Sequence, residues 1–373
     1  MKVAICGYPP LAQEMQHELK DIDFKFFIED FISDRGDDDK FTNTLPTITF
    51  FEFRRMIDAG ELDGVFIAED GQLPFTRSVV KICQLYNVKQ IGIMDLGLIT
   101  PFSQCFWLES EKPYLTQLEA NLIDGCNLNC KGCAHFSSLF KTDEIYPLEI
   151  FRRDLKQVGQ SCNVVAFYLL GGEPLLLKNL DEYIKIARQY LPRSNLHLVT
   201  NGLLIPSLPK SFFDVVRENN VVIEISNYPP TDKIIDKIKS VLDEAQMLYV
   251  IRGSAKDRLF NVFLTLHAGN DATKARYFCC NNNCRFLRNG KIYKCPVDAL
   301  SFRFAEHFGI ENFPQSTGVD IFSKNFPLLL DMLNGEVELC NWCSEEVRKI
   351  PWEVAHSPKL EDWLADPDEL RNF

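Results

Sequence analysis

The stretch that decides the fold of this chain is CNLNCKGC, Cys126 to Cys133, which directly follows the apolar run Leu118 to Ile123. Its three cysteines have the spacing C-x3-C-x2-C. A loop this short lets three thiolates converge on one face of a cubane iron–sulfur cluster, whereas an ordinary [4Fe–4S] site takes four cysteines. The spacing therefore predicts a cluster in which one iron is left open for a ligand from outside the protein.

A structural zinc loop is the alternative interpretation, because zinc sites also use C-x2-C pairs with a further ligand nearby. His135 is the candidate for that further ligand. A zinc loop, however, does not account for two later motifs. Leu-Leu-Gly-Gly-Glu-Pro at 169–174 and Thr-Asn-Gly at 200–202 each follow an apolar run, as residues at the end of a strand do. We therefore favour an iron–sulfur site.

The order, spacing and strand context of these motifs resemble the radical S-adenosylmethionine (SAM) superfamily. In that family the open iron binds the amino and carboxylate groups of SAM, a Gly-Gly-Glu segment contacts the SAM ammonium, and polar residues at later strand ends hold the ribose. The resemblance implies that Cys126, Cys130 and Cys133 are the ligands of a [4Fe–4S] cluster. It also implies a set of SAM contacts: Gly171, Gly172, Glu173, Pro174, Thr200, Asn201 and Ser226.

Two points of this resemblance stay open. Many family members carry an aromatic residue just before the third cysteine, where it contacts adenine, but this chain has Gly132. Either His135 or Phe136 replaces it, or backbone alone holds the adenine. The ribose candidates Thr200, Asn201 and Ser226 also suit helix capping or turn formation.

The composition is that of an ordinary soluble globular protein of two or three domains, with 373 residues, 46% hydrophobic and 25% charged residues. A net charge of −12 without a basic block excludes a nucleic-acid partner. No apolar run approaches the roughly 20 residues that span a bilayer, and the N-terminus lacks a signal peptide. We expect a cytoplasmic protein without a membrane partner, in which thirteen cysteines serve metal binding rather than disulfides.

Residues 1–95 alternate strand-like and helix-like stretches, which predicts a Rossmann-like parallel sheet with helices on both faces. The turn after the first strand is Gly-Tyr-Pro-Pro at 7–10 rather than G-x-G-x-x-G, and its prolines remove backbone donors that would bind a pyrophosphate. Glu29 and Asp30 occupy the place of a ribose partner. The domain resembles degenerate nucleotide-binding-like domains attached to surface-polysaccharide biosynthesis proteins. We expect a scaffold or substrate-presenting role, with nucleotide binding as the alternative.

Residues 96–113 are interpreted as a linker, after which the β/α alternation restarts. Five or six βα units over 114–275 predict an open, partial (β/α)6 barrel, which is the radical SAM core by resemblance. The motifs all follow strands, at the end of the barrel where such folds place their chemistry. The expected strands are 118–123, 164–170, 196–200, 221–226 and 247–251, with 262–266 as a weaker sixth.

Residues 276–350 form a cysteine-rich module, followed by a tail at 351–373 that we expect to be acidic and helical, with no assigned chemistry. Asn289-Gly290 between alternating apolar runs predicts a hairpin. The hairpin would bring Cys284 beside Cys295. A later C-x2-C pair at 340–343 precedes a stretch that is expected to be helical.

Hairpin arm and C-x2-C pair together resemble the truncated auxiliary-cluster module called twitch, a short form of the SPASM module. The resemblance implies a second [4Fe–4S] cluster, fully ligated by protein, with Cys279 or Cys280 as the alternative to the first of its ligands. A zinc-ribbon-like site remains the other interpretation. The implied ligands are Cys284, Cys295, Cys340 and Cys343.

By resemblance, the chain is a radical SAM oxidoreductase that cleaves SAM to a 5′-deoxyadenosyl radical and abstracts a substrate hydrogen. A one-electron donor such as flavodoxin or ferredoxin is implied. A fully ligated second cluster suits a net two-electron oxidation, and twitch-bearing relatives include a dehydrogenase of an amino-cyclitol alcohol. The leading hypothesis is therefore oxidation of a carbohydrate or cyclitol alcohol.

Two alternatives stay open: a peptide-modifying radical SAM maturase with a peptide substrate, and a non-enzymatic iron–sulfur or zinc redox protein. The first usually carries a winged-helix peptide-recognition domain, which residues 1–95 do not resemble. The sequence assigns no catalytic base. Tyr168, His197, Glu224 and Arg252 lie in or near expected strands, and a buried structural role is the default interpretation for each.

Overall fold

A computed structural model of the chain describes residues 1–7, 12–13, 15–16, 19, 22–28, 45–68, 74–85, 87–94, 105–109, 111–254, 259–279, 284–316 and 318–372. The chain divides into two compact units. Unit 1 comprises Met1–Thr116 with Cys162–Val165, and unit 2 comprises Gln117–Ser161 with Ala166–Phe373. Within the described residues, no helix is both long and apolar enough to cross a membrane.

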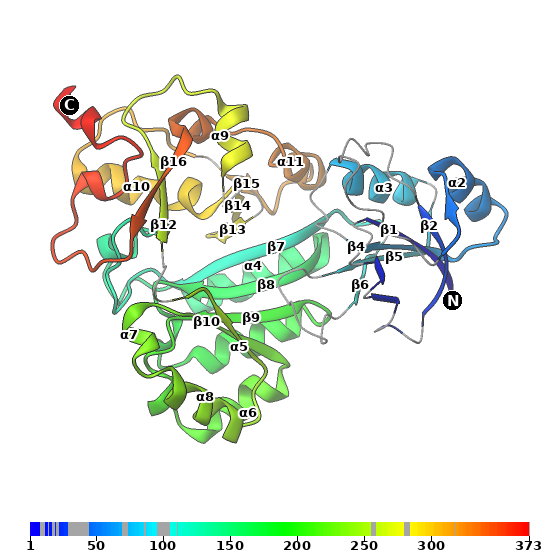
Figure 1. Cartoon of the computed structure of the whole chain (residues 1–373), viewed down its shortest axis with the longest axis horizontal. Coiled ribbons are helices and arrows are strands. Elements are labelled where there is room, and N and C mark those ends of the chain that lie inside the picture. Colours follow the sequence, from blue (N-terminus) through cyan, green and yellow to red (C-terminus); the bar gives the residue numbers. More distant parts are fainter. Residues whose placement is uncertain are drawn as a thin grey trace. The chain divides into compact units, whose positions relative to one another are not determined.

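Unit 1 contains the predicted parallel sheet, in the order β3-β2-β1-β4-β5-β6 (Figure 1). The first five strands pair in parallel and β6 joins antiparallel. The N-terminal turn at 8–10 and the acidic pair Glu29-Asp30 lie outside the described residues. The elements are β1 (Lys2–Gly7), β2 (Asp23–Ile28), β3 (Thr47–Ile48), α2 (Phe50–Asp58), β4 (Gly64–Ala68), α3 (Pro74–Leu85), β5 (Gln90–Met94) and β6 (Cys105–Trp107).

One part of the predicted linker has regular structure. Strand β6 falls inside 96–113, and Trp107 pairs with Gly92 of β5. The ring of Trp107 packs edge-on against Phe66 of β4, with centroids 6.0 Å apart. Cross-strand aromatic packing of this kind stabilises an edge strand, so residues 105–107 belong to the sheet of unit 1.

Unit 2 is built on an eight-stranded sheet in the order β11-β10-β9-β8-β7-β13-β14-β15. Strands β8 to β11 pair in parallel, and β7 pairs in parallel with β13. The barrel elements are β7 (Tyr114–Ile123), η1 (Ser137–Leu139), α4 (Leu148–Ser161), β8 (Asn163–Gly171), η2 (Pro174–Leu176), α5 (Leu180–Tyr190), β9 (Asn195–Thr200), η3 (Ile205–Ser207), α6 (Lys210–Glu218), β10 (Val221–Ser226), α7 (Pro229–Asp232), α8 (Ile235–Glu244) and β11 (Tyr249–Arg252).

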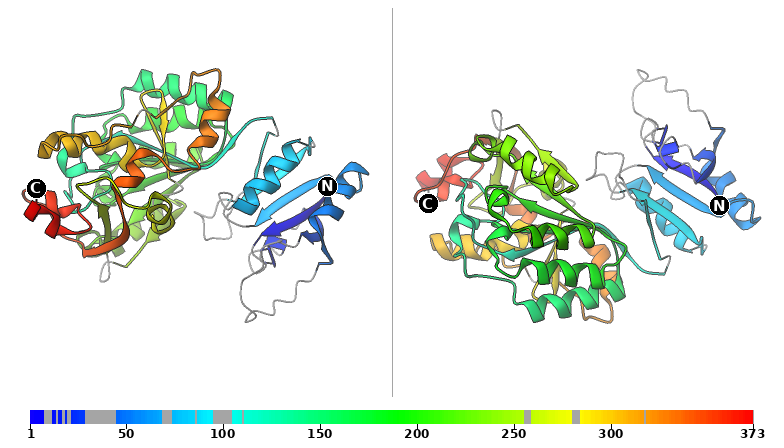
Figure 2. Two further views of the ribbon diagram at one scale, coloured as in Figure 1. Left: turned by 90° about the horizontal axis from the view of Figure 1, so that it is seen from above. Right: turned by 90° about the horizontal axis from the view of Figure 1, so that it is seen from below.

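Most of the C-terminal elements cover one face of this sheet, and three of them, β13, β14 and β15, add strands to its edge. In Figures 1 and 2 they are coloured yellow to red, and in Figure 1 they lie above β7–β10, with α5, α6 and α8 below. They are β12 (Leu259–Leu264), α9 (Ala272–Phe278), β13 (Arg285–Arg288), β14 (Lys291–Tyr293), α10 (Pro296–Phe308), β15 (Val319–Asp320), α11 (Phe326–Met332), η4 (Glu338–Trp342), β16 (Cys343–Pro351), η5 (Leu360–Asp362) and η6 (Pro367–Asn372).

Strand β8 shows how the core is divided between the two faces. It is buried along nearly its whole length, as expected for a parallel strand covered on both sides. Phe167 points to one side, toward Phe151 of α4 at a centroid distance of 6.3 Å. Tyr168 and Leu170 point to the other, into a cluster that includes Phe304 of α10. The C-terminal module thus supplies the second half of the barrel's core.

Two details of the predicted topology need correction. The expected sixth barrel strand forms as β12, but it pairs antiparallel with β16 in a separate two-stranded sheet. The stretch after Cys343, expected to be helical, is strand β16 itself. Its Glu, Arg and Lys residues favour a helix locally, but pairing with β12 overrides this weak preference. The α/β class and the parallel sheets are confirmed.

The predicted hairpin is present and is fastened to helix α4. Asn289 and Gly290 both have positive φ, 47° and 78°, as a two-residue hairpin turn requires. Asn289 N–H donates to the Tyr146 hydroxyl (3.0 Å), and Gly290 N–H donates to Asp154 Oδ2 (2.6 Å). Tyr146 O–H donates to the same Asp154 carboxylate (2.6 Å), which is fully buried.

We predict that Asp154→Ala destabilises the protein by about 3 kcal/mol, because it leaves buried donors without an acceptor. Asp181→Ala is the control, since Asp181 forms an exposed pair with Lys185, and such a pair contributes less than about 1 kcal/mol. Thermal unfolding followed by circular dichroism measures both. An unchanged midpoint for Asp154→Ala would contradict the role of this carboxylate as the fastening point of the hairpin.

Candidate functional site

The three-cysteine loop leaves β7 and turns through two left-handed residues, Asn129 (φ 46°) and Gly132 (φ 64°). A Cβ on Gly132 would lie 2.6 Å from Val262 Cγ1, so no larger residue fits without rearrangement. This explains why the aromatic residue common at this position in the resembling family is absent here. Cys130 is buried, and Cys126 and Cys133 are partly buried.

Of the two aromatic substitutes, Phe136 is closed to a ligand, whereas His135 is only partly buried. Phe136 is 1% exposed and its ring packs against Phe304 and Trp363. His135 Nδ1 lies 2.9 Å from Asn121 Oδ1, and burial lowers the pKa of His135 to about 4, so that the ring is neutral. Within the described part of the chain, no three His, Cys, Asp or Glu side chains lie close enough together to hold a single metal ion.

Backbone and side-chain donors surround the sulfur of Cys126. Leu128 N–H donates to it at 3.4 Å, and Asn201 Nδ2 lies 3.9 Å away. Asn201 Nδ2 also donates to Asn127 Oδ1 (2.7 Å). Burial raises the pKa of the Cys126 thiol to about 12. A bound iron would have to displace this proton, after which the nearby donors stabilise the thiolate.

The Gly-Gly-Glu segment brings the end of β8 into direct contact with the start of the cysteine loop. Gly172 N–H donates to Ile123 O (2.8 Å). A Cβ on Gly171 would lie 2.2 Å from Ile123 O, and one on Gly172 would lie 2.1 Å from Gly125 O. Only glycine permits this approach of two backbones. Pro174 is buried and begins the short helix η2.

Glu173 connects the ends of β8 and β9. It is fully buried, and its carboxylate accepts hydrogen bonds from Thr200 Oγ1 (2.7 Å), Asn201 N (2.8 Å) and Leu175 N (3.0 Å). Burial raises the pKa of Glu173 to about 7, although these hydrogen bonds oppose the shift. The carboxylate therefore acts on this site by fixing the Thr-Asn-Gly turn.

The predicted ribose residues divide accordingly. The Thr200 hydroxyl donates to Glu173 and accepts from Gly202 N (2.9 Å), so it serves the turn. The Asn201 amide faces Cys126 and Asn127. Ser226 ends β10 opposite Arg252 of β11, and its backbone carbonyl accepts from Tyr228 N (3.0 Å). The structure thus groups Asn201 with the cysteine loop and places Ser226 two strands from β8.

A row of polar side chains crosses the strands on the face covered by the C-terminal module. Tyr168 of β8 stacks on His197 of β9, with centroids 4.5 Å apart and an interplanar angle of 13°. His197 Nδ1 lies 2.7 Å from Glu224 Oε1, and Arg252 Nε lies 3.0 Å from Glu224 Oε2. Burial alone would raise the pKa of Glu224, but His197 and Arg252 beside its carboxylate lower it overall.

Glu119 of β7 extends this row and was missed by the sequence reasoning. It is 5% exposed and accepts a hydrogen bond from Gln117 Nε2 (2.6 Å). Burial raises the pKa of Glu119 to about 7, with the negative charge of Glu224 adding to the shift. A period-two alternation along β7 is the signal that could have found it, because Gln117, Glu119 and Asn121 share one face.

A second polar group, also missed, joins the cysteine loop to the hairpin. Arg288 of β13 forms a bidentate pair with Asp124, at 2.9 and 2.8 Å. Asn121 Nδ2 donates to the same carboxylate (3.0 Å) while its Oδ1 faces His135. A bidentate guanidinium–carboxylate pair fixes both distance and orientation. It therefore sets the position of Asp124, which lies just before the loop.

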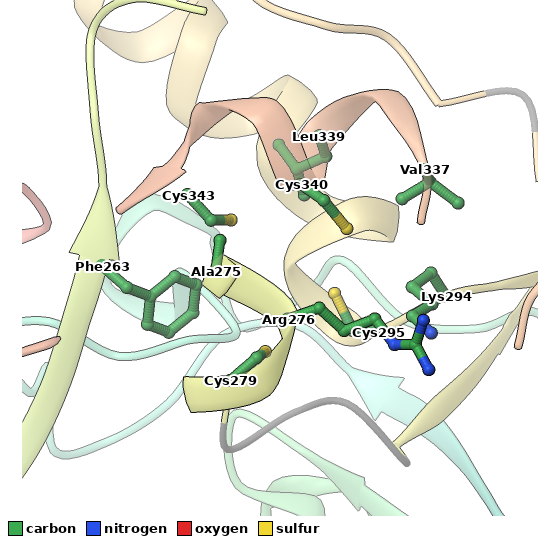
Figure 3. Close-up of a pocket in the computed structure, with 10 residues that line it drawn as sticks. All are labelled: Phe263, Ala275, Arg276, Cys279, Lys294, Cys295, Val337, Leu339, Cys340 and Cys343. Carbon is green, nitrogen blue, oxygen red and sulfur yellow. The ribbon is translucent and has the colours of Figure 1, made fainter. Parts of the chain in front are cut away.

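The later cysteines gather around one cavity (Figure 3). Cys279 lies at the end of α9, Cys295 follows β14, and Cys340 and Cys343 flank the end of η4. All four line the cavity, together with Lys294 and Arg276. Cys284 does not line it; its sulfur accepts from Gln117 Nε2 at 3.6 Å. Cys280 lies outside the described residues.

Buried positive charge accompanies these thiols. Lys294 is 3% exposed and its Nζ donates to Leu333 O (2.8 Å). Burial, with the charges of Arg285 and Arg276, lowers the pKa of Lys294 to about 8. Burial also raises the pKa of Cys295. Four thiols beside a buried cation are a donor set that fits a thiolate-ligated cluster.

Parts of this chain are similar to known proteins. Residues 120–252 match the family model described as "Radical SAM superfamily". GTP 3',8-cyclase of Helicobacter pylori (strain ATCC 700392 / 26695) is 30% identical over 105 residues, covering 28% of this chain and 32% of that protein. That of strain J99 is 25% identical over 215 residues, covering 53% of this chain and 66% of that protein. This chain spans about a third of the length of the 30%-identical relative.

Solved structures align over different shares of the chain. BtrN in complex with AdoMet and 2-DOIA has a TM-score of 0.39 and 16% identity, covering 64% of this chain and 100% of that one. Native anSMEcpe with bound AdoMet has a TM-score of 0.31 and 20% identity, covering 37% of this chain and 43% of that one.

We predict that Gly172→Ala prevents iron binding by the three-cysteine loop, because the added Cβ would push the end of β8 away from Gly125. The expected loss is about four irons per chain. Gly335→Ala is the matched control, since its Cβ would meet only Met332 O at 3.4 Å. Iron analysis after anaerobic reconstitution measures both variants. Equal iron contents would show that the close approach of the two backbones is dispensable.

Proposed function

We propose, from the match of residues 120–252 to the radical SAM family model, that the chain is an enzyme that cleaves SAM reductively and abstracts a hydrogen atom from its substrate. The observation that carries the proposal is the meeting of two motifs far apart in sequence. Asn201, at the end of β9, lies at once against the sulfur of Cys126 and, through its backbone N–H, against Glu173. The cysteine loop and the Gly-Gly-Glu segment thereby form one site.

The residues present fit a [4Fe–4S] cluster and SAM. Cys126, Cys130 and Cys133 would hold the cluster, with N–H donors near two of these sulfurs. When bound, the cluster supplies the electron that splits SAM into methionine and a 5′-deoxyadenosyl radical. The protein would fix the end of β8, where SAM is proposed to bind. Gly171 and Gly172 leave the backbone free of side chains at this point. Ser226 remains the candidate for the ribose.

A second cluster is proposed at the cavity of Figure 3, with Cys279, Cys295, Cys340 and Cys343 as its ligands. This is the alternative ligand set, in which Cys279 replaces Cys284. Four protein thiolates would leave no iron open to substrate, so this cluster would serve electron transfer or stability. Lys294, held by Leu333 O at the cavity wall, would offset part of the negative charge of the thiolates.

The proposed substrate is a carbohydrate or cyclitol alcohol that is oxidised to the carbonyl. The polar row on the inner face supports this class, since a carboxylate and a guanidinium can hydrogen-bond hydroxyl groups. Within that row, the Arg252 side chain is 32% exposed and the Glu224 side chain 7%. Oxidation removes a hydrogen atom, a proton and an electron from the alcohol; the hydrogen atom would pass to the 5′-deoxyadenosyl radical, and the proposed second cluster would supply the acceptor for the electron. Glu119, with a pKa raised to about 7, is suited to accept the proton.

The electron donor proposed for this reaction is a one-electron carrier such as flavodoxin or ferredoxin.

Thirteen cysteines, of which seven are proposed as cluster ligands, suit the reducing cytoplasm, where disulfides are rare and thiolate–metal sites common. We place the protein there on that ground.

We predict that Cys279→Ala lowers the iron content of the reconstituted protein from about eight to about four per chain, because one proposed ligand is lost. Cys284→Ala is the matched control and should keep about eight, since Cys284 does not line the cavity. The reverse result, in which only Cys284→Ala loses iron, would restore the ligand set expected from the hairpin. Zinc in place of iron at this site would contradict a second cluster.

The substrate class is tested by incubating the reduced, reconstituted protein with SAM and a panel of nucleotide-sugars and cyclitols. We predict 5′-deoxyadenosine and an oxidised sugar in equal amounts, measured by mass spectrometry. Glu224→Gln should lower product formation by about 10²-fold, because Arg252 and His197 lose the charge that orients them. Asp214→Asn, on the exposed surface of α6, should leave it unchanged. Turnover only with a peptide, or with none of these alcohols despite intact clusters, counts against the proposal.

A further inference from the structure

The C-terminal segment after β16 pairs with the cysteine loop, although no chemistry could be assigned to it from the sequence. Lys131 N–H donates to Glu353 O (2.9 Å), and Ala355 N–H donates to Asn129 O (2.7 Å). Between them, Cys130 and Val354 form an antiparallel bridge. The tail therefore runs antiparallel beside the loop and is joined to it through backbone hydrogen bonds.

Two indole groups of this segment donate hydrogen bonds to the loop, but to different kinds of acceptor. Trp352 Nε1–H donates to the sulfur of Cys130 at 3.0 Å. Trp363 Nε1–H donates to the backbone carbonyl of Cys133 at 2.9 Å. Only the first bond reaches an atom that would bind iron. A comparison of the two tryptophans therefore separates an electronic effect on the cluster from an effect on the backbone structure of the loop.

Trp352 is held in place from the barrel side. Its ring stacks on Tyr228, with centroids 6.2 Å apart and an interplanar angle of 29°. Tyr228 stacks in turn on Phe260 of β12, at 5.9 Å and 18°. Tyr228 lies two residues beyond the end of β10. The three stacked rings fix the direction of the indole N–H, so the donor is preorganised toward the sulfur.

We propose that Trp352 is a positioning residue. Through its hydrogen bond to Cys130, it sets the reduction potential of the cluster proposed to be held by Cys126, Cys130 and Cys133. A donor to a ligand sulfur stabilises the reduced cluster more than the oxidised one, because the added electron increases the negative charge on sulfur. Trp352 therefore raises the potential. The inference rests on the proposed [4Fe–4S] cluster of the three-cysteine loop, but not on the substrate class or the second cluster.

The test compares Trp352→Phe with Trp363→Phe, each in the anaerobically reconstituted chain of 373 residues. A redox titration follows the electron paramagnetic resonance signal that changes on addition of SAM. Trp352→Phe should lower the equilibrium constant for one-electron reduction about tenfold, a shift of about 59 mV to more negative potential. Trp363→Phe should leave the potential unchanged, since its bond is to a backbone carbonyl.

A second measurement keeps the inference testable if Trp352→Phe binds no cluster. In protein labelled with ¹⁵N-tryptophan, hyperfine spectroscopy of the reduced, SAM-responsive cluster should show coupling to an indole nitrogen, and Trp363→Phe should retain it. A SAM-responsive signal without this coupling, or with equal potentials in Trp352→Phe and the parent, overturns the inference alone. A parent protein without any SAM-responsive signal overturns the proposed function as well.

Discussion

The site depends on the hydrogen bonds that the buried carboxylate of Glu173 accepts. It is fully buried and accepts hydrogen bonds from the end of the neighbouring strand β9 as well as from its own segment. Without it, the Thr200 hydroxyl and the Asn201 N–H would lose their acceptor in the interior. The Asn201 amide would then lose its fixed place beside Cys126. The resemblance assigns Glu173 to contact with SAM. In this structure its carboxylate also stabilises the ends of β8 and β9, where SAM is expected to bind.

A similar pairing of buried groups is seen on the inner face of the barrel, where acidic and basic residues are joined. Glu224 keeps a lowered pKa although it is buried, because His197 and Arg252 both face its carboxylate. The hydrogen bonds to Glu119 do not offset its burial, and its pKa is raised to about 7. The pKa of Glu224 is therefore lowered and that of Glu119 is raised, although both carboxylates lie on the same face of the sheet. Such a division is typical of sites that carry out proton transfer.

The sequence was sufficient for the features that depend on local pattern. The parallel sheets and the hairpin at Asn289-Gly290 follow from periodicity and turn chemistry. What it missed depends on pairing between distant segments. Strand β16 has a helix-favouring composition, and only β12 determines its conformation. The grouping of Cys279 rather than Cys284 with the later cysteines depends on the direction in which α9 ends, which spacing does not encode.

Two buried cations lie near the later cysteines. The chain carries a net charge of −12, yet Lys294 and Arg285 are almost fully buried, at 3% and 2% exposure. Arg285 donates to the backbone carbonyl of Lys294, so the two cations hold each other in place despite their repulsion. Burying like charges together is costly unless a negative group compensates for them. The buried carboxylate of Asp298, which interacts electrostatically with Lys294, supplies one such negative group, and a cluster bound by four thiolates, which is negative overall, would supply another.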